Sequence, residues 1–155
     1  MPADEFAFLK SLSKDVVLTP VEIVKNVALP RIPNQNLHLL VFSCPDEGAT
    51  LRKITAYVKE CVGSDYGLNE DKCKKVILTM LKQLQQLGDN HHGDLRLENI
   101  LYFEKDNSLR WVNFAATHRS ESQEEQTKRD LSDLATATVD LVSGSPQELS
   151  KFKGN

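Results

Sequence analysis

Residues 92–99 gather the side chains of this chain that are best suited to chemistry. The stretch reads HGDLRLEN and carries, in order, His92, Asp94, Arg96 and Asn99. A carboxylate can take up a proton during a reaction, and an amide oxygen can bind a hard cation such as Mg2+. These residue types at this spacing make residues 92–99 the first candidate for a catalytic or ligand-binding loop.

The segments on either side of this loop are predicted to be a helix and a β-hairpin. In residues 69–87, apolar side chains recur at spacings of three and four, as on one face of a helix, and Gly88 is suited to end it. The apolar positions are Val76, Ile77, Met80, Leu81, Leu84 and Leu87. After the loop, residues 100–103 and 109–112 are rich in aromatic and branched side chains and are separated by turn-forming residues. The loop should therefore connect a helix to a hairpin.

The pattern H-x-D-L-x-x-x-N in this setting resembles the catalytic loop of a protein kinase. The resemblance implies that Asp94 accepts the proton of a substrate hydroxyl and that Asn99 holds Mg2+ against the phosphates of a nucleotide. It also implies that Arg96 lies near the transferred phosphate and that His92 supports the loop by packing. A chance match is the alternative, and the flanking helix and hairpin argue against it.

At the end of the hairpin, the chain has Asn113-Phe114-Ala115 where a kinase has Asp-Phe-Gly. The resemblance makes Asn113 a second ligand for Mg2+, but its amide brings no negative charge, so metal affinity should fall. Ala115 cannot adopt a positive φ as easily as glycine, which restricts any flip of the segment. The alternative interpretation is that Asn113 is simply a turn residue after a strand.

A second amphipathic helix is predicted to open at Lys128, to be buried on most sides and to close at Gly144 and Pro146. Its apolar residues are Leu131, Leu134, Ala135, Val139, Leu141 and Val142. In the kinase interpretation Asp130 ties down the backbone of the catalytic loop. An N-cap role for Asp130 is the alternative, and the two can coexist.

The segment between Asn113 and Asp130 is short and polar and lacks the Ala-Pro-Glu anchor of ordinary protein kinases. Together with the following QTKRDLSDL, it is most similar to the kinase-like domain of ribonuclease L, the 2-5A-dependent ribonuclease. It is more loosely similar to the sensor kinase-ribonucleases of the unfolded-protein response.

The N-terminal part can be matched to the small lobe of a kinase. Residues 5–12 resemble the end of its helix, with Glu5 in place of the glutamate that pairs with the ATP-binding lysine; an exposed helical glutamate is the alternative. Residues 21–24 and 37–42 are predicted strands, and the following Ser43 and Cys44 belong to the hinge that would meet adenine through backbone hydrogen bonds. Residues 50–62 should form the next helix.

The expected fold is therefore α+β and kinase-like, with residues 1–43 as a remnant of the small lobe and residues 44–155 as a truncated, mostly helical large lobe. No G-x-G-x-x-G pattern occurs among the seven glycines, and no strand before Glu5 supplies the ATP-binding lysine. The chain is thus expected to be a fragment, an isoform or a truncated product.

Composition narrows the class of protein. The net charge of −3 argues against direct, sequence-independent binding of nucleic acid, which needs a basic surface. Cys44, Cys61 and Cys73 are odd in number and lack zinc-site spacing, so reduced thiols in the cytoplasm are expected. The neighbours His91 and His92 are not expected to bind a metal. No segment resembles a signal peptide or is apolar for long enough to cross a bilayer.

Two functions remain open. The first is a regulatory, pseudokinase-like domain of the ribonuclease L type, which binds ATP and Mg2+ weakly or not at all and acts through protein partners or self-association at exposed apolar helix faces. The second is an active Ser/Thr protein kinase whose small lobe is missing from this chain, with Asp94 still functional. The family's ribonuclease activity cannot be assigned to any residue here.

Overall fold

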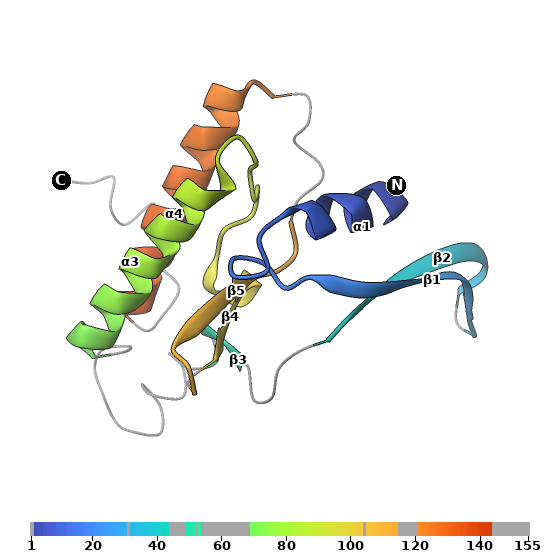
Figure 1. Ribbon diagram of the computed structural model, residues 1–155, viewed down its shortest axis with the longest axis horizontal. Coiled ribbons are helices and arrows are strands. Elements are labelled where there is room, and N and C mark those ends of the chain that lie inside the picture. Colours follow the sequence, from blue (N-terminus) through green and yellow to red (C-terminus); the bar gives the residue numbers. More distant parts are fainter. Residues whose placement is uncertain are drawn as a thin grey trace.

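The computed structural model describes residues 2–30, 32–43, 49–51, 53, 69–103, 105–114 and 121–143. Along the chain the elements are α1 (Pro2–Ser11), β1 (Pro20–Leu29), β2 (Ile32–Phe42), β3 (Ala49–Thr50), α3 (Glu70–Leu87), the 3-10 turn η1 (Leu97–Asn99), β4 (Ile100–Phe103), β5 (Ser108–Trp111) and α4 (Gln123–Ser143). The long α3 and α4 lie side by side at one end of the molecule, and the β1–β2 hairpin extends from the other (Figure 1). The short sheet β3–β4–β5 lies between them. The predicted α+β class is confirmed.

Helix α3 has the limits that the sequence predicts. The side chain of Asn69 caps its first turn by accepting a hydrogen bond from the backbone N–H of Lys72 at 2.9 Å. Gly88 follows the last turn with φ = 58°, a conformation that glycine adopts without strain. The core-facing side chains are Cys73, Val76, Met80, Gln83 and Leu87. Leu81 belongs to the apolar face that the sequence predicts but is 47% exposed, because it lies toward the edge of that face.

The hairpin of β4 and β5 also agrees with the sequence. The strands pair antiparallel, with Ile100 opposite Trp111. Asn107 forms the turn with φ = 52°, in the left-handed region that asparagine tolerates better than most residues. Trp111 is completely buried, and its backbone pairs on the far side with the segment after α1, through hydrogen bonds with Val16 and Leu18.

A buried glutamine joins the helix to this sheet. The Nε2 of Gln83 donates to the backbone oxygens of Asp15 at 3.2 Å and Leu109 at 3.0 Å. Because a buried amide is costly without partners, these bonds set the register of α3 against β5 and the N-terminal segment. The hairpin that follows the candidate loop is therefore held from both sides.

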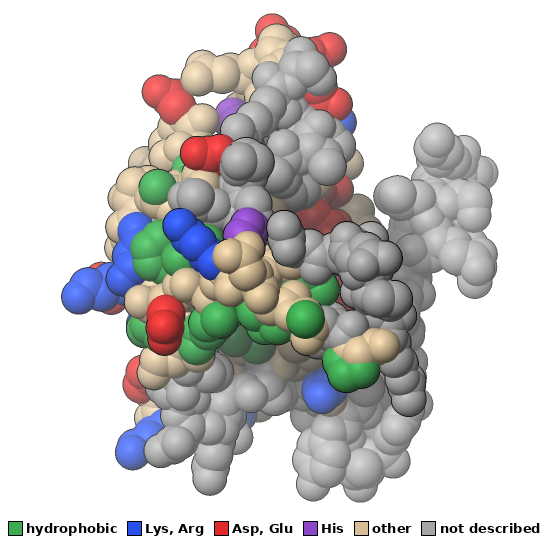
Figure 2. Space-filling view, turned by 90° about the vertical axis from the view of Figure 1, so that its right-hand side faces the viewer, with side chains coloured by type: hydrophobic (Ala, Val, Ile, Leu, Met, Phe, Trp, Pro, Cys, Tyr) green, Lys and Arg blue, Asp and Glu red, His purple; other side chains and the backbone are tan. Residues whose placement is uncertain are grey.

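The β1–β2 hairpin is longer than predicted. Pairing extends the expected strands 21–24 and 37–42 to ten and eleven residues, with register shifts in β1 and a positive φ of 57° at Asn26. Polar residues beyond the predicted limits belong to the strands because they pair with the opposite strand. The apolar pattern of one strand alone does not show this pairing. Viewed from the hairpin side, hydrophobic side chains form a band among charged ones (Figure 2).

Helix α4 begins earlier than predicted. Ser122 and Glu125 form a capping box at the start of the helix. The Ser122 Oγ accepts a hydrogen bond from the Glu125 N–H at 3.3 Å, and the Glu125 carboxylate accepts one from the Ser122 N–H at 2.9 Å. The predicted start at Lys128 was wrong, and so was the N-cap alternative for Asp130, which lies two turns into the helix.

The predicted burial of α4 on most sides was also wrong. Leu134, Ala137 and Leu141 are buried. An exposed stripe runs along the other side of the helix and contains Leu131, Val139 and Val142. Leu131, at one end of the stripe, borders a hollow between α3 and α4, so α3 leaves this side of α4 only partly covered.

Some predictions fall outside the described residues: most of the 50–62 helix, Cys44, Cys61, Ala115, Gly144 and Pro146. Leu51, from the start of the predicted helix, is completely buried in the core. Among the described residues, none of the helices is both long and apolar enough to span a bilayer.

Candidate functional site

Helix α4 holds the loop of residues 92–99 through a buried carboxylate. The two oxygens of Asp130 accept the backbone N–H groups of His92 and Gly93, each at 2.9 Å. Asp130 is only 1% exposed, so its charge is compensated by these donors rather than by water. Gly93 has φ = 85°, which a residue with a side chain rarely adopts. The loop turns sharply at this glycine and is fixed to α4 there.

A second carboxylate of α4, which the sequence did not single out, lies near the same loop. Burial raises the pKa of Asp133, and the negative charges of Asp130 and Asp94 act in the same direction, against a backbone hydrogen bond from Leu95. The carboxylate of Asp133 therefore lies within electrostatic reach of the loop. The one-turn spacing of Asp130 and Asp133 was the signal in the sequence that could have indicated this.

His92 is completely buried and serves as a backbone anchor. Its Nδ1 accepts the N–H of Asp94 at 3.2 Å, so the proton lies on Nε2, which donates to the backbone oxygen of Val112 at 2.8 Å. Burial lowers the pKa of His92 and favours this neutral form. The imidazole thus ties the start of the loop to the residue after β5.

An aromatic contact joins α1 to the loop. The ring of Phe114 lies 4.4 Å from the His92 ring and 5.9 Å from the Phe8 ring, the latter edge-to-face. Trp111 meets His92 from another side at 5.7 Å. Sequence reasoning did not single out Phe8, since the pattern of α1 alone does not show which of its phenylalanines faces the loop.

The polar residues predicted to act together lie in one connected cluster of Asp94, Arg96, Asn99 and Asn113, which we call the loop cluster. The Nδ2 of Asn99 donates to the backbone oxygen of Asp94 at 2.9 Å and to its Oδ2 at 3.0 Å. The other carboxylate oxygen of Asp94 lies 3.1 Å from the Nε of Arg96. The Nδ2 of Asn113 donates to the Oδ1 of Asn99 at 3.0 Å. Both carboxylate oxygens of Asp94 are therefore engaged within the protein.

The oxygens of Asp94 decide how the two amides are oriented. The Asn99 Nδ2 donates to both the backbone oxygen and the Oδ2 of Asp94, and a backbone oxygen can only accept, so Asn99 turns its NH2 toward Asp94. Its oxygen then faces Asn113, which has to present a donor. The orientation of Asn113 thus follows from acceptor atoms of Asp94, to which Asn113 itself has no hydrogen bond.

The residues of the loop cluster do not fit the Mg2+ that the kinase resemblance implies. Asn113 presents nitrogen to Asn99, so a cation between them would require the Asn113 amide to turn over and their bond to break. Mg2+ is usually held by at least one carboxylate, and neither of these ligands is one. Among the described residues, no three His, Cys, Asp or Glu side chains are grouped as metal ligands.

Asn113 also fits its alternative interpretation as a turn residue. Its backbone has φ = 57°, which asparagine tolerates, and the preceding Val112 N–H donates to the backbone oxygen of Asn99 at 3.0 Å. The turn brings the Asn113 side chain to Asn99. The two interpretations are thus compatible.

Of the predicted cofactor-binding residues, Asn99 belongs to the loop cluster, whereas Glu5 and Ser43 form none of its hydrogen bonds. Glu5 is partly buried in the first turn of α1, and Ser43 is exposed just after β2. Cys44 lies outside the described residues. Nucleotide binding by these residues stays a prediction.

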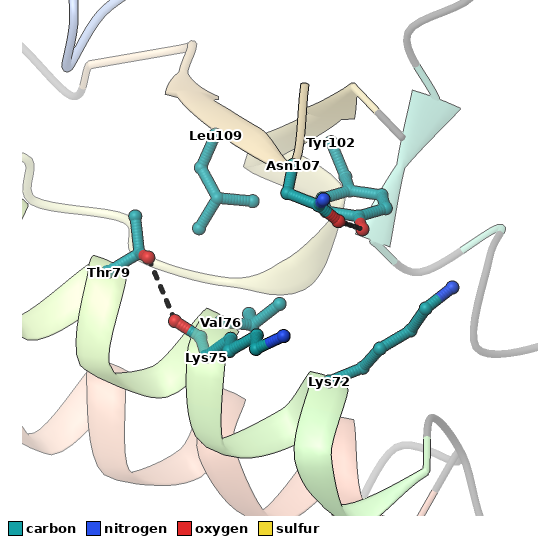
Figure 3. Close-up of a pocket in the computed structure, with 7 residues that line it drawn as sticks. All are labelled: Lys72, Lys75, Val76, Thr79, Tyr102, Asn107 and Leu109. Atoms are coloured by element: carbon teal, nitrogen blue, oxygen red, sulfur yellow. Dashed lines mark hydrogen bonds between the residues drawn. The ribbon is translucent and has the colours of Figure 1, made fainter. Parts of the chain in front are cut away.

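Two hollows in the described surface lie away from the loop cluster. One, of about 260 Å³ including open space, lies between α3 and the β4–β5 hairpin (Figure 3). It is lined by Lys72, Lys75, Val76, Thr79, Tyr102, Asn107 and Leu109. The other lies between α3 and α4, and Leu81, His91 and Leu131 contribute to its wall. Lys72 in the first hollow is partly buried and Lys75 is exposed, and neither hollow contains a residue predicted for catalysis.

Comparison with known proteins gives the fold class. No protein-family model matches the chain, and no curated protein matches its sequence. The structure of the Neurospora crassa PAN3 pseudokinase superposes with a TM-score of 0.69 at 12% identity, over 94% of this chain and 36% of that one. A mutant of the same pseudokinase gives 0.72 at 13% identity, over 97% and 38%. The chain thus has a protein kinase-like fold and spans rather more than a third of these structures.

Proposed function

We propose that this chain is a pseudokinase-like module of the ribonuclease L type, which transfers phosphate slowly or not at all and acts through protein contacts. The observation that carries the proposal is the engagement of Asp94. A base must accept the proton of a substrate hydroxyl, and here the hydroxyl would compete with Arg96 at one oxygen of the partly exposed Asp94 carboxylate and with Asn99 at the other. The likeness to a pseudokinase fold is consistent with this role.

The metal side of the loop supports the same proposal. Phosphoryl transfer relies mainly on positioning and on neutralising phosphate charge with Mg2+. Asn113 contributes no charge and presents its nitrogen to Asn99. ATP and Mg2+ should therefore bind weakly or not at all, and any transfer should be slower by orders of magnitude than in an active kinase.

Exposed apolar side chains on the two long helices support a role in protein contacts. Apolar side chains are exposed on both long helices: Leu78 and Leu81 on α3, and Leu131, Val139 and Val142 on α4. Exposed apolar groups of this kind favour association with another protein or with a second copy. Three cysteines, odd in number and without zinc-site spacing, suit a reducing compartment, so a cytoplasmic location belongs to the proposal.

Incubation with labelled ATP and Mg2+ separates this proposal from an active Ser/Thr kinase. We expect wild-type protein and Asp94→Ala to give the same background labelling of a generic hydroxyl substrate and of the chain itself. Transfer that disappears in Asp94→Ala would establish the kinase instead. Asp106→Ala, at an exposed turn of the hairpin, is the matched control for loss of a carboxylate.

The contact role has its own test. Leu131→Ser and Val142→Ser should weaken self-association or partner binding in sedimentation velocity, because they shorten the exposed stripe of α4. Ser132→Ala, on the same helix, should not. If the stripe variants sediment and bind as the wild type does, these side chains are not the contact surface.

A further inference from the structure

We infer that Asn113 takes the place of a divalent cation as the side-chain partner of Asn99 at the end of β5, so that the loop cluster is assembled without metal. The inference deepens the proposed function and rests on it for the view that the cluster is not catalytic. Its basis is one hydrogen bond and the direction in which that bond must run. The Asn113 Nδ2 donates to the Asn99 Oδ1 at 3.0 Å.

The other hydrogen bonds of Asn99 fix which atom of Asn113 must donate to it. Both hydrogens of the Asn99 amide go to Asp94, one to its backbone oxygen and one to its carboxylate. Asn99 is buried, with 4% exposure, so its oxygen depends on a partner within the protein. Asn113 supplies that partner from an exposed position at the end of the hairpin. A neutral amide therefore occupies the Asn99 oxygen that a cation would otherwise bind, beside the backbone bond from Val112 to Asn99.

An aspartate at position 113 would make the loop cluster depend on a cation. A carboxylate there would face the Asn99 oxygen with another acceptor, and the two would repel each other unless a cation lay between them. With a cation present, the carboxylate supplies the charge that Mg2+ prefers. The single change Asn113→Asp should thus convert a metal-independent cluster into a metal-dependent one.

Thermal unfolding with and without Mg2+ tests the inference. The midpoint of the wild-type protein should be the same in Mg2+ and in EDTA. Asn113→Asp should unfold at a lower temperature in EDTA and should recover by about 3–5 °C when Mg2+ is about ten times its dissociation constant. Either Mg2+-dependent stabilisation of the wild type or no response in Asn113→Asp would overturn the inference.

Asn107→Asp is the matched control. Asn107 lies at the other end of β5 with a similar φ of 52°, and its Oδ1 accepts from the hydroxyl of Tyr102 at 2.6 Å. An aspartate keeps that acceptor, so this variant should show no response to Mg2+. A response as large as that of Asn113→Asp would mean that added surface charge alone is sufficient, and the inference would fail.

A measurement on the wild type covers the case in which Asn113→Asp does not fold. The side-chain amide signals of Asn99 and Asn113 in 15N NMR spectra should stay in place during a Mg2+ titration. Movement of both signals would show that the cation reaches these oxygens, which contradicts the inference. Such movement without Asp94-dependent phosphate transfer would leave the proposed function standing, whereas transfer would remove the proposed function itself.

Discussion

The ring of Phe114 lies 4.4 Å from the ring of His92. On its other side, at 5.9 Å, Phe114 meets Phe8 of α1, so the position of the N-terminal helix is coupled to the loop. A helix that is distant in sequence therefore contributes directly to the order of residues 92–99.

The coupling between Phe8 and Phe114 can be measured with a double-mutant cycle. Phe8→Ala, Phe114→Ala and the double variant should give a coupling free energy of about 0.5–1.5 kcal/mol in urea unfolding. Phe6, on the same helix, serves for the control cycle: its ring faces Lys10, so its coupling to Phe114 should be close to zero. Equal coupling in both cycles would contradict the ring contact.

Asp130→Asn should destabilise the protein strongly. The carboxylate accepts two backbone N–H groups, and an amide would bring its own NH2 against one of them in a buried position. We expect a loss of about 2–3 kcal/mol in the free energy of unfolding, measured with urea. Glu124→Gln, exposed on the same helix, should change stability by less than about 0.5 kcal/mol. A small effect of Asp130→Asn would show that the loop does not depend on α4.

His92 should make stability fall as the pH is lowered. Its pKa is below the ordinary 6.5 in the folded state because burial disfavours the charged form. The unfolded chain therefore takes up the proton first, and stability is lost as the pH falls from about 6.5 toward the folded pKa. NMR should show the His92 ring still neutral below the ordinary value. His92→Gln should remove this part of the pH dependence, and an unchanged slope would exclude His92 as its source.

Ser122→Ala should destabilise α4 by removing half of the capping box. The expected loss is about 1 kcal/mol, measured by thermal or urea unfolding. Hydrogen bonds from Ser122 lower the pKa of Glu125, so the capping contribution is present above the ordinary value of 4.5 and is lost as the pH falls through the folded pKa. Ser132→Ala, at an exposed position within the helix, is the control. Wild-type stability in Ser122→Ala would contradict the capping box.

Local patterns in the sequence were enough to predict α3, the β4–β5 hairpin and the residues of the loop cluster. Each depends on interactions between near neighbours: the Asn69 cap, the apolar period of α3, and the turn at Asn107. The spacing of His92, Asp94 and Asn99 likewise lies within a single loop. Such features are visible without knowledge of the fold.

Tertiary structure decided the rest. The sequence does not show that Phe8 meets Phe114, that α3 leaves one side of α4 only partly covered, or that Asn113 presents its nitrogen to Asn99. Each depends on segments brought together by folding, and the last follows because Asn99 turns its NH2 toward the oxygens of Asp94. The residue types could be read from the chain, but the direction of the hydrogen bonds depends on which groups become neighbours in space.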